Sequence, residues 1–360
     1  MDLEFLFIYE KYREARNRET GFYLFATFST IVKIMNHADT ILYLSRGDVE
    51  KLEISIDEVI KIVDNAFREK AAGRTEMPPK PGIHPKENAF IHAMPAYLPE
   101  MQAAGIKWVS GYPENTKRNL PYISGLLILN DPETGFPISV MDCTWITAKR
   151  TGAVTAVAAK YLAREDSKVL GILGCGVQGR SNLEALLRMC KNLEKVKAYD
   201  IIDENLKKYV KEEAIKHSIK ISAESSPKKA VEGSDIVVSA GPILRQPHPV
   251  IERSWFKDGG LACPLDFDSY WKPEAAFSMD KFCVDDIQQL WYYKRQGYFS
   301  QLPKVYAELG DIVAGQKSGR ENRNERIMSM NLGLAIEDIA TAKLIFERAN
   351  QTGIGIRLPL

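Results

Sequence analysis

The second half of the chain alternates short apolar runs with segments of helical periodicity. Short apolar runs bounded by turn residues are typical of strands in the middle of an α/β sheet. The runs cover residues 169–173, 196–199, 220–223, 236–240, 260–264 and 282–284. Their alternation with helical segments predicts a doubly wound parallel sheet of the α/β class.

The first part of the chain has a different pattern, in which one helix precedes several strands. The helix is predicted over residues 56–71, where Ser55 and Glu58 can form a capping box and Gly73 ends the segment. A turn at residues 130–135 joins the last two strands as a hairpin. The strands are predicted at residues 40–45, 89–94, 106–111, 122–130 and 137–141. This part therefore predicts an α+β domain with an antiparallel sheet.

Two further helices connect these parts. Residues 147–163 form a helix of small residues that bridges to the parallel sheet, and residues 327–349 are predicted to form one long helix. Because the parallel alternation has finished by then, the last helix is expected to return to the first domain. Residues 74–87 are rich in proline, lysine and glycine and are predicted to be a loop.

The parallel-sheet domain is therefore expected to be an insertion in the first domain. Residues 1–40 mix aromatic and basic residues and are treated as an N-terminal extension to which the sequence assigns no role. The expected organisation has an extension at 1–40, a first domain at 41–148 and 326–360, and a Rossmann-type domain at 149–325.

The first apolar run of the parallel-sheet domain leads into Gly174-x-Gly176-x-x-Gly179. Gly174 permits a tight turn, Gly176 lets the backbone approach a diphosphate, and Gly179 lets helix and strand pack closely. Val177 and Gln178 begin a helix whose free N–H groups and positive dipole end attract phosphate. The segment predicts a dinucleotide-binding site.

Asp200 ends the next apolar run, about 20 residues beyond the last glycine, where a carboxylate binds the ribose 2′-hydroxyl. A carboxylate at this position would repel a 2′-phosphate. Ile201 and Ile202 follow, where an NADP enzyme more often carries Arg or Ser. NAD is therefore the expected cofactor.

The composition excludes several classes of protein. Hydrophobic residues make up 45% of the 360 residues, and 48 Lys and Arg balance 47 Asp and Glu, so a nucleic-acid partner is not expected. The five cysteines and five histidines are dispersed, so no metal site is expected. No apolar stretch is long enough for a membrane span, and the N-terminus does not resemble a signal peptide. A cytoplasmic protein is expected.

Several motifs resemble the ornithine cyclodeaminase/mu-crystallin family. They are GIKWVSGYPENTKRNL at 105–120, TGFP at 134–137, TAKRTGA at 147–153 and GLAIED at 333–338. They occur in the right order, with the glycine loop between them, and the resemblance spans about residues 40–355. It implies a substrate-binding and dimerisation domain interrupted by a Rossmann domain, a small amino-acid or imino-acid substrate, NAD, and a homodimer.

The resemblance also implies a set of substrate-binding residues. Arg74, Lys107 and Arg150 match the basic residues that bind the substrate carboxylate in the family. Charge-assisted pairing would both hold and orient the substrate. Arg150 lies in a helix of small residues and Lys107 in an apolar strand, so these two are less typical of surface charges.

The acid/base candidate follows the strand predicted at residues 260–264. Carboxyl ends of strands face the cofactor crevice in a doubly wound sheet. Ungapped counting places Asp268 on the catalytic aspartate of the family, and Lys272 matches a lysine found in the cyclodeaminases. A shift of two residues would nominate Asp266 instead, and a structural role for the loop carboxylate is a third alternative.

Weaker candidates surround this set. Thr147, Ser239, Lys272 and Asn331 are candidates for contacts with the cofactor. Thr147 and Ser239 could instead act in capping and turns, and Asn331 stands where a serine is common in the family. His92 occupies a position where cyclodeaminases place an acid that could steer a distal ammonium group. Residues 292–295 are interpreted as the surface of a helix.

The expected activity is that of an NAD-dependent enzyme acting at Cα of a small amino acid. The ornithine cyclodeaminase type is the leading hypothesis, in which L-ornithine gives L-proline and ammonia through hydride transfer and an imine. An amino-acid dehydrogenase or a cyclic ketimine reductase is the enzyme alternative. The alternative of another class is a mu-crystallin-like protein that binds nucleotides and small ligands.

Overall fold

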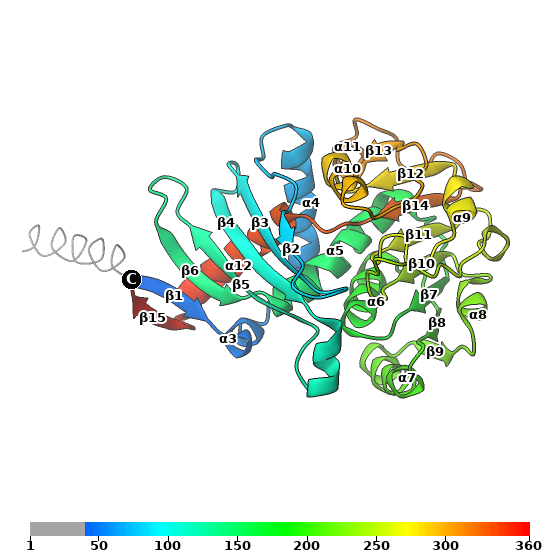
Figure 1. Ribbon diagram of the computed structural model, residues 1–360, viewed down its shortest axis with the longest axis horizontal. Helices are drawn as coiled ribbons and strands as arrows, with labels where there is room; N and C mark the ends of the chain where they lie inside the picture. Colours follow the sequence, from blue (N-terminus) through cyan, green and yellow to red (C-terminus); the bar gives the residue numbers. More distant parts are fainter. Residues whose placement is uncertain (1–39) are drawn as a thin grey trace, which may run out of the picture.

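The structure is a computed structural model that describes residues 40–360 of the chain. Two sheets lie side by side, each with its own helices (Figure 1). One sheet has seven strands and the other has eight. The proposed N-terminal extension lies outside the described residues, except for Thr40.

The seven-stranded sheet contains the elements predicted for the first domain. Neighbouring strands are antiparallel, except that β1 runs parallel to β6. In sheet order the strands are β15 (Ile356–Pro359), β1 (Thr40–Leu44), β6 (Pro137–Asp142), β5 (Ile123–Asn130), β4 (Ala103–Gly111), β3 (Phe90–Leu98) and β2 (Gly82–Ile83). The predicted hairpin is confirmed, since β5 and β6 pair antiparallel.

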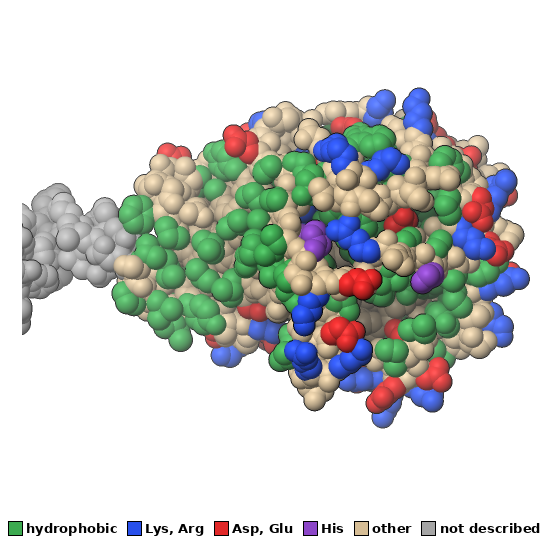
Figure 2. Space-filling model, in the orientation of Figure 1, with side chains coloured by type: hydrophobic (Ala, Val, Ile, Leu, Met, Phe, Trp, Pro, Cys, Tyr) green, Lys and Arg blue, Asp and Glu red, His purple; other side chains and the backbone are tan. Residues whose placement is uncertain are grey.

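One face of this sheet is covered by helices and the other is open. The helix α12 (Ala335–Thr352) lies behind the sheet in Figure 1, and α4 (Ile56–Ala71) and α5 (Thr144–Leu162) pack against α12. On β4, Lys107 is fully buried toward these helices, whereas the next residue, Trp108, is 48% exposed on the other face. This alternation follows from the two-residue period of a strand. Figure 2 shows hydrophobic side chains gathered over the open face.

The eight-stranded sheet is parallel throughout, which confirms the predicted α/β class. The chain reverses its direction of winding between β7 and β10, which is where doubly wound sheets bind ligands. In sheet order the strands are β13 (Ala307–Glu308), β12 (Lys281–Val284), β14 (Ile327–Met330), β11 (Leu261–Pro264), β10 (Ile236–Ser239), β7 (Val169–Leu173), β8 (Lys195–Tyr199) and β9 (Lys220–Ala223).

The prediction of one helix over residues 327–349 is wrong at its start. The first four of these residues form β14, which lies between β11 and β12, and the helix α12 begins only at Ala335. All four residues of β14 are buried. A strand that is buried on both faces has no two-residue alternation of apolar and polar residues, so the sequence pattern did not reveal the boundary between strand and helix.

The remaining helices connect the strands of the parallel sheet. The glycine loop leads into α6 (Val177–Met189), which packs against the bridging helix α5 at Gly152, where a side chain would collide with Ser181. The other helices are α3 (Arg46–Lys51), α7 (Asp203–His217), α8 (Pro227–Val231), α9 (Pro273–Phe277), α10 (Ile287–Arg295) and α11 (Leu309–Val313).

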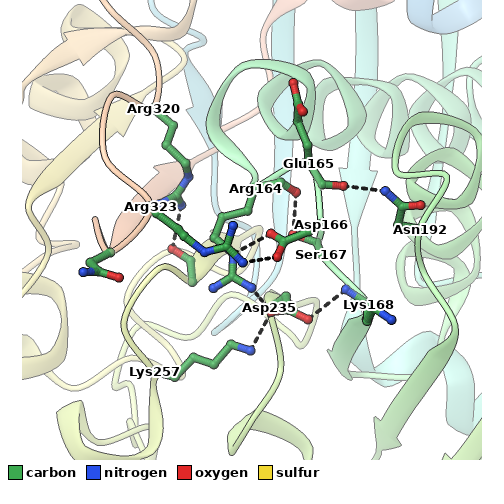
Figure 3. Close-up of polar contacts among 12 residues, drawn as sticks. Arg164, Glu165, Asp166, Ser167, Lys168, Asn192, Asp235, Lys257, Arg320 and Arg323 are labelled. Carbon is green, nitrogen blue, oxygen red and sulfur yellow. Dashed lines mark hydrogen bonds and ion pairs between the residues drawn. The ribbon is translucent and has the colours of Figure 1, made fainter.

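An ion-pair network fastens the end of α5 to the amino ends of the parallel strands. Asp235 accepts hydrogen bonds from the backbone N–H groups of Lys168 and Val169 at 2.8 and 2.9 Å, and it pairs with Arg164 and Lys257 (Figure 3). Cofactors bind at the opposite, carboxyl edge of such a sheet. We therefore assign this network to stability. Within residues 40–360 no helix is long and apolar enough to cross a membrane.

Candidate functional site

The glycine loop between β7 and α6 has the geometry of a diphosphate cradle. Gly174 has a φ of +99°, and a side chain at Gly179 would collide with the carbonyl oxygen of Gly174. Gly176 is the N-cap of α6 without a side-chain cap, and a Cβ there would meet no atom within 4 Å. The free N–H groups of the helix therefore face open space, which suits a phosphate group.

Asp200 lies beside this loop at the end of β8. One carboxylate oxygen accepts a hydrogen bond from the backbone N–H of Cys175 at 2.7 Å, and the other from that of Ile202 at 2.9 Å. The carboxylate is thus held next to the cradle, where it can pair with a ribose hydroxyl and repel a phosphate. Ile201 is 84% exposed beside it and offers apolar surface to an adenine ring. These residues fit a non-phosphorylated dinucleotide.

Ser239 ends β10, and Asp266 lies in the loop that follows β11 of the same sheet. The Ser239 hydroxyl donates to one carboxylate oxygen of Asp266 at 2.8 Å, and the backbone N–H of Gly241 donates to the other at 3.1 Å. The indole N–H of Trp271 donates to Ser239 at 3.2 Å. Burial is the main reason that the pKa of Asp266 rises to about 7.

Asp268 lies only two residues later but faces another way. Phe267, between the two aspartates, has a φ of +59°. The Asp268 carboxylate lies near the backbone N–H groups of Phe299 and Ser300 and lines a small cavity of about 50 Å³. Its partial burial raises its pKa, and these hydrogen bonds oppose the rise. The two carboxylates are therefore distinct groups with separate surroundings.

A buried basic cluster forms where β4, α5 and α12 meet. The Lys107 ammonium lies 2.6 Å from a carboxylate oxygen of Asp338, and Arg150 Nε lies 2.9 Å from the other. A second nitrogen of Arg150 lies 2.6 Å from Glu337. Both acids belong to the first turn of α12, where negative charge is favoured by the helix dipole. The structure thus brings Lys107 and Arg150 together in the interior.

Lys80 joins this cluster although sequence reasoning missed it. Its ammonium donates to the carbonyl oxygens of Leu332 at 2.6 Å and Gly333 at 2.9 Å, and the residue is 8% exposed. Burial, reinforced by the charge of Arg150, lowers the pKa of Lys80 to about 7. The sequence around Lys80 shows only a lysine between prolines, a pattern that is typical of a surface loop and does not predict burial.

Arg74 lies outside the cluster. Its side chain is about half exposed and pairs with Glu100 at 3.3 Å. Lys107 and Arg150 are matched by Asp338 and Glu337, whereas Lys80 forms no ion pair among residues 40–360. Asp285 and Glu337 already favour the charged form of Lys80, and a bound carboxylate within hydrogen-bond reach would favour it further.

The start of α5 connects the basic cluster to the glycine loop. Thr147 Oγ1 lies 3.4 Å from the Lys107 ammonium, and the Thr147 carbonyl accepts a hydrogen bond from the side chain of Gln178 at 3.3 Å. Asn331 directly precedes Leu332 and Gly333, whose carbonyl oxygens accept hydrogen bonds from Lys80. It is buried, and its amide nitrogen has no acceptor within the described part of the chain. An unsatisfied buried donor of this kind suits a bound polar ligand.

Lys272 lies away from the basic cluster, whereas Tyr293 lies against it. Lys272 pairs with Glu252 at 2.8 Å and with no residue of the basic cluster. Tyr293, interpreted from sequence as helix surface, is buried, because it lies on the inward side of α10. Its ring lies 5.3 Å from the Lys80 ammonium and 4.8 Å from the ring of Phe267. Tyr293 therefore lies between the basic cluster and the loop that carries both aspartates.

His92 forms the neighbouring part of this wall. Its ring stacks on Phe90 with centroids 4.3 Å apart and lies 6.3 Å from Tyr293. Burial, together with the charge of Lys80, lowers the pKa of His92 to about 3. The ring is therefore neutral, and it offers no negative charge to a distal ammonium group.

The chain is similar to known proteins in both sequence and fold. The sequence pattern of the ornithine cyclodeaminase/mu-crystallin family matches residues 41–353. Alanine dehydrogenase of Archaeoglobus fulgidus is 38% identical over 328 residues, which are 88% of this chain and 98% of the relative. The Δ1-pyrroline-2-carboxylate reductase of Thermococcus litoralis, solved with NADH and L-proline, superposes with a TM-score of 0.81 at 39% identity, covering 88% of this chain and 100% of that one.

An archaeal alanine dehydrogenase dimer with bound NAD superposes with a TM-score of 0.78 at 36% identity, over 89% of this chain and 99% of that one. A lysine cyclodeaminase reaches the same TM-score at 22% identity and bears on the fold alone. The chain belongs to the ornithine cyclodeaminase/mu-crystallin family.

Proposed function

We propose that the protein is an NAD-dependent enzyme that transfers hydride at Cα of a small amino or imino acid. This proposal rests on the buried basic cluster, which Thr147 connects to the glycine loop. The glycine loop has open space beside Gly176. The loop from Gly174 to Gly179 and Asp200 would hold NAD. Bound NAD would supply a hydride acceptor, or a donor in its reduced form.

The chain's own residues would orient the substrate and move its proton. Lys80, Lys107 and Arg150 would bind the α-carboxylate, because they offer charge-assisted hydrogen bonds in a water-poor interior. Asp268 would exchange the proton of the substrate nitrogen, with Asp266 as the alternative. A carboxylate with a pKa raised toward neutrality is suited to both directions of that transfer. Such a group also argues against a protein that only binds ligands.

We further propose a net oxidation or reduction as the leading activity. The relatives at 36–39% identity are alanine dehydrogenases and a pyrroline-2-carboxylate reductase. The neutral ring of His92 also gives no counter-charge for the distal ammonium of ornithine. Ornithine cyclodeamination, the leading hypothesis from sequence, is kept as the second candidate because it uses the same hydride transfer and imine.

Stoichiometry separates the two activities. The purified protein would be incubated with L-ornithine and a substoichiometric amount of NAD⁺, and separately with L-alanine or L-proline and excess NAD⁺. We expect the absorbance of NADH at 340 nm to rise with L-alanine or L-proline. With L-ornithine we expect no excess of proline over NAD⁺. Proline and ammonia in many-fold excess over NAD⁺ would instead establish the cyclodeaminase.

A homodimer is proposed through the open face of the seven-stranded sheet. Apolar residues of neighbouring strands share this face, and large ones among them are well exposed, including Trp108 at 48% and Leu126 at 47%. An exposed apolar surface of this kind marks an interaction site. A two-fold axis would let the same face cover itself.

A further inference from the structure

A second cavity lies beside the aromatic wall, between the two domains. Its volume is about 230 Å³, and it opens between the loop that precedes β3 and the loop that follows β10. The lining side chains include two cationic groups, Arg245 and Lys86, and one acid, Glu87. None of these residues takes part in the site described above.

Arg245 is held in a fixed orientation in this cavity without a carboxylate partner. One guanidinium nitrogen donates to the carbonyl oxygen of Gln296 at 2.5 Å, and another lies 3.1 Å from Nε2 of His84. The guanidinium lies 4.2 Å from the ring centre of Tyr298. Among residues 40–360 Arg245 forms no ion pair. A fixed, half-buried guanidinium without a counter-charge is suited to bind a carboxylate.

Aromatic side chains lie between the cavity and the basic cluster. Phe90 lines the cavity and stacks on His92, whose ring lies 6.1 Å from that of His84. Tyr293, which lies against Lys80, has its ring 5.5 Å from that of Tyr298. Lys80 and Arg245 both lower the pKa of His92, which is consistent with a place between them.

We propose that Arg245 binds a carboxylate at the far end of the substrate. The substrate class would then be an α-amino or α-imino dicarboxylate, with the α-carboxylate on Lys80, Lys107 and Arg150 and the distal carboxylate on Arg245. The same cations would repel a distal ammonium group, so a diamino acid is a poor match. This inference rests on the proposed function.

A series of amino acids with the same carbon chain tests the proposal. L-Glutamate, L-norvaline and L-ornithine differ mainly in a distal carboxylate, methyl or ammonium group. We expect kcat/KM with NAD⁺ to be at least about tenfold higher for L-glutamate than for the other two, as one charged hydrogen-bond pair would give. A preference of the wild type for L-norvaline or L-ornithine would overturn the proposal.

Arg245→Gln should lower kcat/KM for L-glutamate about 10- to 100-fold and leave that for L-norvaline unchanged. Arg253→Gln is the matched control, since Arg253 is an exposed arginine of the same domain without an ion pair among the described residues. Arg245→Lys, which keeps the charge but loses the planar fork, should recover part of the loss. Equal losses for both amino acids would contradict a distal subsite.

A binding measurement separates failure of the subsite from failure of the enzyme activity. Glutarate and butyrate would be added to the protein with saturating NAD⁺, and thermal unfolding would be followed. We expect glutarate to raise Tm in the wild type but not in Arg245→Gln, and butyrate to raise it less in both. Arg245-dependent glutarate binding without turnover of any amino acid would keep the subsite and reject the proposed activity. If glutarate does not raise the Tm of the wild type, the subsite is rejected. It is also rejected if Arg245→Gln weakens NADH binding as much as it weakens glutarate binding.

Discussion

Lys107 and Arg150 show how a charged residue can be recognised from its local pattern. A lysine inside an apolar strand and an arginine in a helix of small residues are less typical of surface charges, and both are buried here against Asp338. Lys80 had no such signal, because its burial depends on Leu332 and Gly333, about 250 residues away in the chain.

The first prediction compares two arginines proposed from sequence for the same role. Arg150→Lys keeps the charge but loses the fork that spans Glu337 and Asp338, so kcat/KM should fall about 10- to 100-fold. Arg74→Lys should have little effect, because Arg74 pairs with Glu100 on the surface. Steady-state kinetics would test both variants, with NADH affinity and Tm as controls for the fold. An equal loss in Arg74→Lys would contradict our assignment.

The second prediction concerns the dependence of stability on pH. The pKa of Asp266 is about 7 in the folded protein and about 3.8 when unfolded, so between these values only the folded state keeps the proton. The free energy of unfolding should therefore fall as pH rises from about 4 to 7, and this contribution should then stay constant. Asp266→Asn should remove the dependence and gain about 2 kcal/mol relative to wild type between pH 5 and pH 8.

Denaturant unfolding at several pH values would measure this difference. Parallel curves for the wild type and Asp266→Asn across the range would show that Asp266 is ionised in the folded protein. In that case its proposed role as the alternative proton carrier would also lose its support.

At the scale of elements, the strand–glycine loop–helix unit was predicted from sequence because its chemistry is local. Gly174 and Gly179 are required by atoms within a few residues or next to the neighbouring strand, whereas a Cβ at Gly176 would meet open space. The start of α12 was not predicted, since β14 is buried on both faces and only its position between β11 and β12 distinguishes it from a helix.

The third prediction uses two glycines of this unit that differ in their surroundings. Gly179→Ala should lower Tm and abolish tight NADH binding, because the new methyl group would collide with the Gly174 carbonyl. Gly176→Ala should leave Tm unchanged, since its φ is −79° and its Cβ meets open space, but should weaken NADH binding about tenfold or more by crowding the diphosphate. Protein fluorescence with NADH and thermal unfolding would measure the two effects. Unchanged NADH affinity in Gly176→Ala would place the cofactor elsewhere.

At the scale of the molecule, each of the two sheets and its helices carries a different part of the proposed site. The parallel sheet carries the cradle and both aspartates, and the seven-stranded sheet with α5 and α12 carries Lys107 and Arg150 with their acids. Hydrophobic side chains gather over the open face of the seven-stranded sheet (Figure 2), which is the face that we propose contacts a second copy.

The fourth prediction tests the proposed dimer. Trp108→Glu places a charge on the open face and should convert a dimer to a monomer, as measured by light scattering after size exclusion. Trp291→Glu is the matched control, because Trp291 is 45% exposed but lies on α10 of the other domain. Dimers that persist in Trp108→Glu and dissociate in Trp291→Glu would assign the interface to the other domain.

The sequence by itself determined the α/β class, the strand that leads to the glycine loop, the family and two buried cations. These features are encoded by periodicity, glycine spacing and residues that conflict with their local surroundings. Only the tertiary structure decided that Lys80 joins the basic cluster, that Tyr293 is buried, that Asp266 and Asp268 face different surroundings, and that Arg245 lacks a counter-charge. Each of these depends on contacts between segments far apart in the chain, and local patterns carry no information about which distant side chains will meet.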